Sequence, residues 1–288
     1  AGSTTTDVDL SVAVGYGAGN ADMTSDANGT VCIGSVSGNA ITSGIGNTAV
    51  GYYALAVEND GDYNTAIGYH ALTAQEGVSG TVANTAVGYG AGDAITTGQR
   101  NTILGAYALS TSTDVDSVVA IGQGAIENGN ATADADGTVA IGRYALLPLT
   151  SGRRNTAIGY ESLKSNVIGD NCTAVGYQSL QTYNSDSDGD GNNTALGYAA
   201  GSAVSTGINN VLIGSQAGDG FDTESDIIAI GYGAAGGTLN GANRIIAIGS
   251  QAMTGAATGG GTIAIGYEAL KLITSGGQNT VVGYQAMA

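Results

Sequence analysis

The residues best suited to chemistry are three aspartates in one short segment. Asp186, Asp188 and Asp190 alternate with small residues and precede Gly191. In this Asp-x-Asp-x-Asp-Gly spacing a tight loop turns three carboxylates toward one hard cation, which predicts a Ca²⁺ site. The twelfth position, where an EF-hand loop has its bidentate glutamate, is Gly197, so the match is partial. Turns rich in Asp and Gly also occur without any metal, and that interpretation stays open.

Two further kinds of candidate site are weaker. Asp134 and Asp136, which precede Gly137, form a shorter version of the same motif and are a second candidate for Ca²⁺. Asn-x-Ser/Thr tripeptides are acceptors for glycosylation, although they also arise by chance in a chain rich in Asn and Thr. The four candidate acceptors are Asn28, Asn130, Asn171 and Asn192.

No catalytic set is recognisable. His70, the only histidine, occupies a position whose residue type varies from copy to copy of a repeat, and no Ser-His-Asp or Cys-His set can be built around it. The glycines of Gly15–Gly19 lack the lysine and the strand-to-helix context of a phosphate loop. Cys32 and Cys172 occupy different positions of the repeat, eight copies apart, so we expect no disulfide. The sequence therefore predicts no enzymatic activity and no organic cofactor.

The element that must position these residues is a repeat. Its phrase is a small or polar residue, an apolar residue, Gly, often Tyr, and then Ala or Ser three places after the Gly. We call the shared glycine the marker glycine. The sixteen marker glycines are Gly15, Gly34, Gly51, Gly68, Gly88, Gly105, Gly122, Gly142, Gly159, Gly176, Gly197, Gly214, Gly231, Gly249, Gly266 and Gly283. Short regular repeats stack on one another instead of forming a globule.

The spacing of the marker glycines contains a second period. Most intervals are 17 residues, and every third interval is 18 to 21 residues, which gives a superperiod of three repeats, about 54 residues. The longer segments are mostly polar or acidic. They are residues 20–29, 73–77, 128–137, 183–192 and 236–243. Either each repeat forms one turn, giving a stack roughly 75 Å long at about 4.8 Å per strand, or three repeats share one turn and the stack spans only about 25 Å.

Within one repeat, alternation predicts β-structure. The residue before the marker glycine is Val, Ile or Leu in every copy, and the residue three before it is Thr, Val or Ile. These positions share one face of a strand, which we expect to be the buried face, with Ala and the marker glycine on the other. Turn residues such as Thr97-Gly98 suggest two short strands and two turns per repeat. Stacking in register predicts ladders of Asn and Tyr, which recur at fixed positions. The expected fold is an all-β parallel β-solenoid, or β-roll, and residues 1–288 are expected to form a single elongated domain.

Composition limits the partners. The net charge is −17, and only Arg153 and Arg154 are adjacent basic residues, so nucleic acid is not an expected partner. No apolar run reaches the ~20 residues of a membrane span. The start at Ala1 suggests a processed secreted chain or an excised fragment, and the absence of a recognisable cap suggests that copies associate end to end. We therefore expect an extracellular or cell-surface location.

The phrases Asn64-Thr65-Ala66-Ile67-Gly68-Tyr69-His70-Ala71-Leu72 and Ser11-Val12-Ala13-Val14-Gly15 resemble two known repeat groups. One is the head of trimeric autotransporter adhesins, and the other is the repeat of phage tail fibres. The adhesin resemblance implies a left-handed parallel β-roll with three chains around one axis. The 17-residue repeat and the superperiod depart from the adhesin pattern, and a single chain with three repeats per turn is the alternative to a trimer.

These observations favour a non-enzymatic structural or adhesive fibre outside the cell, with further copies of itself as partner and possible recognition of cell-surface glycans. The alternative is a tail-fibre or receptor-binding segment of a virion, organised as a homotrimer. Ice binding is a third interpretation, because flat solenoids with rows of Thr order water. It is weakened because the Thr position is Thr in only eight copies, a mixture that suits an inward-facing core better.

Overall fold

The computed structural model describes residues 11–24, 27–76, 78–187 and 190–287. Contacts within it group the chain into two compact units. Unit 1 comprises Ala1–Tyr144 and Pro148–Ser151, and unit 2 comprises Ala145–Leu147 and Gly152–Ala288. The described residues contain no α-helix, so the expectation of an all-β solenoid is confirmed.

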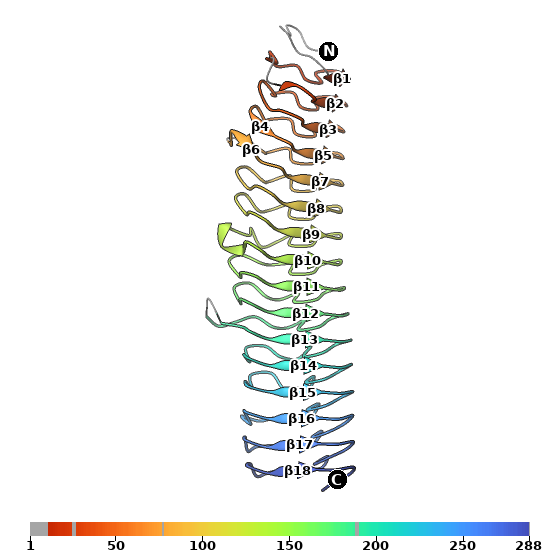
Figure 1. Ribbon diagram of the computed structural model, residues 1–288, viewed down its shortest axis with the longest axis vertical. Helices are drawn as coiled ribbons and strands as arrows, with labels where there is room; N and C mark the ends of the chain where they lie inside the picture. The colour runs from red at the N-terminus through yellow and green to blue at the C-terminus, as the bar shows by residue number, and fades with distance from the viewer. Residues whose placement is uncertain (1–10, 25–26, 77, 188–189, 288) are drawn as a thin grey trace. The chain divides into compact units, whose positions relative to one another are not determined.

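Each turn contributes one three-residue strand to a parallel sheet (Figure 1). The strands of unit 1 are β1 (Val12–Val14), β2 (Val31–Ile33), β3 (Thr48–Val50), β5 (Thr65–Ile67), β7 (Thr85–Val87), β8 (Thr102–Leu104), β9 (Val119–Ile121) and β10 (Val139–Ile141). The strands of unit 2 are β11 (Thr156–Ile158), β12 (Thr173–Val175), β13 (Thr194–Leu196), β14 (Val211–Ile213), β15 (Ile228–Ile230), β16 (Ile246–Ile248), β17 (Ile263–Ile265) and β18 (Thr280–Val282).

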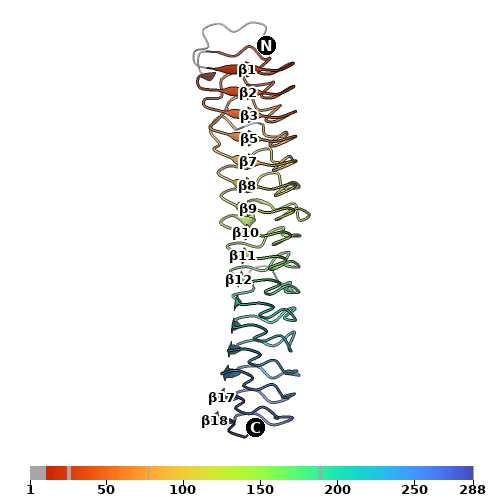
Figure 2. The ribbon, with the colours of Figure 1, turned by 90° about the vertical axis from the view of Figure 1, so that its right-hand side faces the viewer.

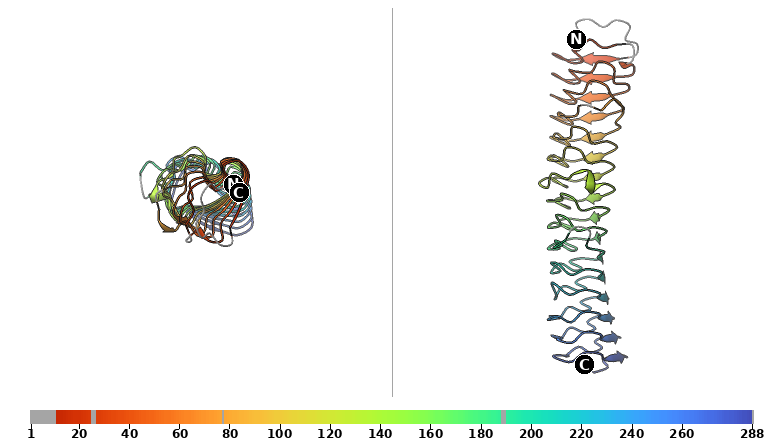
Figure 3. Two further views of the ribbon diagram at one scale, coloured as in Figure 1. Left: turned by 90° about the horizontal axis from the view of Figure 1, so that it is seen from above. Right: turned by 90° about the vertical axis from the view of Figure 1, so that its left-hand side faces the viewer.

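The strands pair in register with the equivalent residues of the next repeat. In unit 1, Thr65 pairs with Thr85 and Ala66 with Ala86, and unit 2 repeats this pattern from β11 to β18 (Figures 2 and 3). One repeat is therefore one turn, and the alternative of three repeats per turn is wrong. The second strand expected in every repeat is also wrong as a general rule, because the only other described strands are β4 (Gly61–Asp62) and β6 (Gly80–Thr81), which pair with each other.

The expected burial of the two strand faces is reversed. The middle residue of the strand is the buried one: Ala49, Ala66 and Ala86 have no exposed surface. The branched residues on either side of it point outward, and Ile67 and Leu104 are 37% and 47% exposed. The alternation of residue types correctly distinguishes the two faces of each strand, but the larger apolar side chains do not fit inside the coil. The interior of a 17-residue turn is narrow and already holds the Ala or Ser three residues after each marker glycine and, in many turns, a Leu after that.

Exceptions to the buried alanine show how tightly this interior is packed. Leu212 takes the alanine position in β14, and glycines lie at the facing positions, Gly201 in the preceding turn and Gly218 in the same turn. A Cβ on Gly218 would lie 2.7 Å from Leu212 Cδ2. Ile103 has the same relation to Gly92, whose Cβ would lie 2.8 Å from Ile103 Cδ1. A larger side chain at one position is thus accommodated by glycine at the next, which conserves the core volume.

The marker glycines are required by the backbone. Gly88 has φ +140°, and a Cβ on it would lie 2.7 Å from the carbonyl oxygen of Gly105 in the next turn. Any other residue would combine an unfavourable φ with a clash against backbone. The marker glycines of successive turns therefore stack on one another, and the chain turns away from each strand at the same position of the repeat.

Buried asparagines form the expected ladder. In unit 1, Asn84 accepts a hydrogen bond at Oδ1 from the backbone N–H of Asn101 (2.9 Å) and donates from Nδ2 to the carbonyl of Gly98 (2.7 Å). Asn101 continues the pattern to the N–H of Val118 (2.9 Å) and the carbonyl of Val115 (2.7 Å). In unit 2, Asn155, Asn193 and Asn210 make equivalent pairs of bonds. Each amide satisfies two buried backbone groups that the strand ladder does not reach.

The polar segments between strands carry inward anchors that the sequence patterns did not reveal. In most turns the side chain seven residues after the marker glycine returns to the interior. The large apolar examples are Ile41, Ile95, Leu149, Tyr183, Val204 and Phe221. In unit 1, β4, β6 and the 3₁₀ turn η2 (Ala133–Ala135) lie on the side from which the strands enter the sheet, at the left of Figure 1.

Replacing Asn101 with Ala tests the amide ladder. The variant leaves the N–H of Val118 and the carbonyl of Val115 buried without their partners, so we expect a loss of about 2–4 kcal/mol of local stability. The measurement is amide hydrogen exchange at Val118 together with thermal unfolding. Gln123→Ala, an exposed position, is the control and should change stability by less than about 0.5 kcal/mol. Unchanged protection at Val118 would show that the ladder is not needed.

Candidate interaction surface

The outward residues of the strands form a continuous surface in each unit, which we call the outer strip. In each turn it consists of the residues three before, one before and one after the marker glycine. The first position is always Val, Ile or Thr and the second always Val, Ile or Leu. Because the strands pair in register, each position forms a straight row along its unit. Val14, Leu104 and Leu196 are 57%, 47% and 49% exposed.

Tyrosines line one edge of the outer strip where the chain leaves the strand. Tyr52, Tyr69 and Tyr89 stack in unit 1 with ring centroids 5.2 Å apart in both steps. In unit 2, Tyr160, Tyr177 and Tyr198 stack at 5.2 and 5.4 Å, confirming the expected Tyr ladder. Within these stacks the ring faces cover one another, so each stack presents mainly ring edges and hydroxyl groups outward. This arrangement is poorly suited to stacking on a flat ligand.

The outer strip is almost free of charge. Among its three rows only Arg143 is charged, although the chain has a net charge of −17. The acidic residues that the structure describes lie outside the sixteen stacked strands, and several accept hydrogen bonds from the backbone. Asp62 accepts a hydrogen bond from the N–H of Ile45 (2.8 Å), and Asp170 accepts one from that of Arg153 (2.7 Å). Much of the acidity is therefore part of the turn structure.

The candidate Ca²⁺ ligands lie in these segments. Asp186 and Asp190 are exposed, and Asp188 lies outside the described residues. Asp134 is exposed in η2, and Asp136 accepts a hydrogen bond at Oδ1 from the N–H of Asp116 (3.0 Å). Within the part of the chain that the structure describes, no three His, Cys, Asp or Glu side chains are grouped to hold a metal. Ca²⁺ binding stays a prediction for both segments.

The candidate glycosylation sites are accessible. Asn28, Asn130, Asn171 and Asn192 are all exposed. Asn171 and Asn192 both have φ 55° and lie two residues before a strand, next to the outer strip. Asn192 Nδ2 donates to Asn209 Oδ1 at 3.4 Å, which continues an amide row outside the coil. Glycosylation at these four asparagines stays a prediction.

The potential catalytic residues are dispersed. The ring of His70 stacks on the rings of Tyr53 (centroid distance 5.3 Å) and Tyr69 (4.4 Å), so His70 is part of an aromatic cluster. Cys32 and Cys172 are buried, unpaired thiols, and burial raises the pKa of each to about 11. A thiol with so high a pKa is a poor nucleophile.

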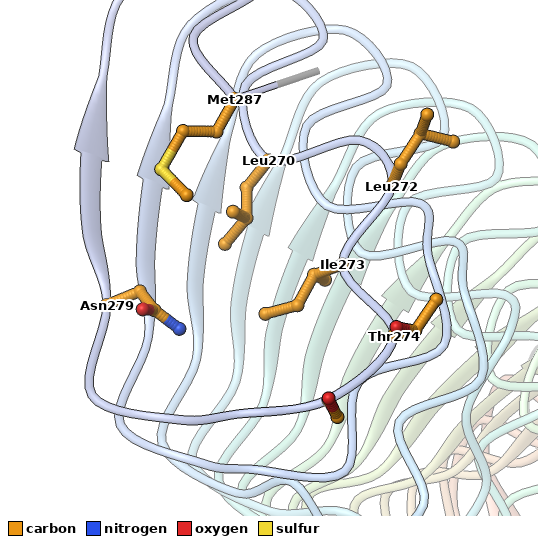
Figure 4. Close-up of a pocket in the computed structure, with 7 residues that line it drawn as sticks. Leu270, Leu272, Ile273, Thr274, Asn279 and Met287 are labelled. Atoms are coloured by element: carbon orange, nitrogen blue, oxygen red, sulfur yellow. The ribbon is translucent and has the colours of Figure 1, made fainter.

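A small pocket of about 200 Å³ lies in the last described turn of unit 2 (Figure 4). Leu270, Ile273 and Asn279 point into it and Met287 lies beside it. Leu270 and Ile273 occupy positions that are covered by the following turn elsewhere, as at Leu163 and Asn166. The pocket is thus a section through the ordinary interior of the coil, in which Asn279 occupies the position of the buried asparagine ladder.

Glu58 is a fully buried carboxyl group in an inward anchor position. Its Oε1 accepts the backbone N–H groups of Asn59 (2.9 Å), Asp60 (3.2 Å) and Gly61 (2.8 Å), and its Oε2 has no partner among the described groups. Burial raises the pKa of Glu58, and the three N–H bonds only partly oppose that effect. The hydrogen bonds of Glu58 thus hold the shape of the turn, but burial of its carboxylate costs desolvation free energy.

We expect Glu58→Gln to stabilise the protein at neutral pH. A carboxyl group with a raised pKa in the folded state favours folding below its ordinary pKa, and this contribution is lost as pH rises through the raised value. The advantage of the variant in melting temperature should therefore grow as the pH rises above about 4, the ordinary pKa of a glutamate. Glu76→Gln, at an exposed carboxyl, should show no such pH-dependent difference. A constant difference between wild type and Glu58→Gln would contradict the argument.

The chain was compared with known proteins. Its sequence matches no protein-family model and no curated protein, so the resemblance to adhesin heads and tail fibres rests on the repeat phrase alone. The described residues form no helix long and apolar enough to cross a membrane.

Proposed function

We propose that this chain is a non-enzymatic structural segment of an extracellular fibre. One observation carries the proposal: within each unit, successive turns repeat the same strand register and the same type of inner packing, while variation is concentrated in outward loops. Such a stack is a rod whose length grows with the number of repeats. Its organised polar groups, the Asn amides above all, satisfy backbone and leave little for chemistry.

An adhesive role is part of this proposal. The longer segments project from every third turn and vary in sequence, so they would carry recognition of a cell surface, including its glycans. Segment 183–192, with three candidate Ca²⁺ residues, is the most acidic of them, and segments 128–137 and 20–29 have two aspartates each. A rod with periodic loops would serve equally in a tail fibre of a virion, which remains the alternative. End-to-end addition of copies is proposed from the repeat, because the backbone of one turn is the template for the next.

Electron microscopy of the purified chain tests the structural role. We expect thin rods, with filaments of constant width as protein concentration rises. X-ray fibre diffraction of aligned material should show a meridional reflection near 4.8 Å from the strand spacing. Compact particles without elongation at every concentration would contradict a fibre function. Turnover of any glycan substrate by the same preparation would contradict the non-enzymatic assignment.

A further inference from the structure

We propose that the outer strip is the surface through which copies of this chain pack side by side. This inference rests on the proposed fibre function and names the partner that the outer strip binds. The starting observation is the reversed polarity of the strands. Residues that a globular protein would bury, such as Ile67 and Leu104, are presented to solvent in straight rows. Large apolar patches of this kind mark protein interfaces.

The extent of the outer strip is sufficient for a specific interface. Eight strands at about 4.8 Å and a width of about five residues give roughly 600 Å² for one unit. Two copies that meet over one unit would together bury about 1,200 Å², which reaches the range of specific protein interfaces. The outer strip of one unit alone is therefore large enough for a specific interface.

Charge favours another copy of the chain over a charged partner. Two molecules of net charge −17 repel one another over most of their surfaces. The outer strip is where they can approach, because its only charged residue is Arg143. A basic partner would instead be drawn to the acidic segments between the strands. A neutral surface on a strongly acidic molecule fits association with a like molecule.

Periodicity also favours another copy. Each row contains one side chain per turn, and the registered pairing of the strands keeps these side chains at a constant interval. An occupant that contacts a whole row must present groups at the same interval. A second copy of this chain has that interval by construction, so contacts made at one turn are available at the next. Rows of Thr, Val and Ile are also narrow enough to interdigitate between facing sheets.

The decisive experiment is the concentration dependence of molar mass, measured by light scattering. The wild-type chain should give integral multiples of 28.1 kDa that dissociate on dilution. The double variant Ile67→Glu/Leu104→Glu places two like charges in the outer strip without entering the core, and its association should weaken at least about tenfold. Thr97→Glu/Ala133→Glu makes the same charge change at exposed loop positions and should associate like wild type.

A conservative pair protects the test against misfolding. Ile67→Thr/Leu104→Thr keeps residue types that β-strands favour and removes apolar area only, so it should fold normally and associate more weakly. Circular dichroism of each variant establishes that the fold is intact. A wild-type chain that stays at 28.1 kDa at all concentrations would overturn the proposal, as would association unaffected by all strip variants.

Cross-linking locates the contact. Leu104→Cys places a thiol in the outer strip, and oxidation should give a disulfide between copies, whereas Thr97→Cys on a loop should remain monomeric. The native thiols are buried and should not interfere. Equal cross-linking at both positions would overturn the assignment.

Two outcomes separate the alternatives. Thermal hysteresis by a strictly monomeric chain, lost in the strip variants, would assign the outward Thr rows to ice and overturn the copy interface. Filaments that form by end-to-end addition while all strip variants associate like wild type would also overturn the interface, but would leave the fibre function standing.

Discussion

Everything in this molecule depends on the registered pairing of each turn with the next. A three-residue strand is too short to be stable alone, and a strand inside the stack is held on both sides, as β7 is by β5 and β8. The buried asparagines extend the pairing beyond the strand, because the amide of Asn84 bonds two backbone groups of the following turn, the carbonyl of Gly98 and the N–H of Asn101. Without these bonds the coil would enclose unsatisfied N–H and C=O groups at every level.

The registered pairing also supports an unusual backbone. After the marker glycine, residues two and four places on repeatedly adopt left-handed conformations, as at His70 (φ 59°) and Leu72 (φ 47°). Such conformations are unfavourable for residues other than Gly, Asn or Asp. They persist here because the N–H of each residue reaches a carbonyl of an adjacent turn, at Tyr52 and Ala91 respectively. The local strain is thus offset by bonds that exist only in the stack.

Repeat length, strand position and the Asn and Tyr ladders could be predicted from the sequence, because they follow from spacing alone. The orientation of the strand could not. Alternation in Thr65, Ala66 and Ile67 separates two faces, but choosing the inner one requires the width of the coil, which depends on side chains elsewhere in the turn. The inward anchors were missed for a related reason: Ile95 and Phe221 are single apolar residues within polar segments, with no periodicity around them.

The candidate sites show the same limit. The spacing of Asp134 and Asp136 suggests cation ligands, but spacing cannot tell which carboxylates the backbone uses, and Asp136 is used by the N–H of Asp116. The outer strip was present in the sequence as two apolar rows. Such rows are expected in the core because apolar residues are usually buried, and the expectation fails here because the interior of the coil is too narrow for these side chains.

The pairing of Leu212 with Gly201 and Gly218 has a consequence for how such a chain evolves. A turn with a large inner residue is viable only when the turn before it leaves space, as Gly201 does for Leu212, so the turns are not interchangeable parts. A duplication or deletion that separated Leu212 from its glycines would leave a clash on one side or a void on the other. Recombination would therefore preserve blocks of neighbouring turns, and the history of the chain would be recorded in which repeats have stayed together.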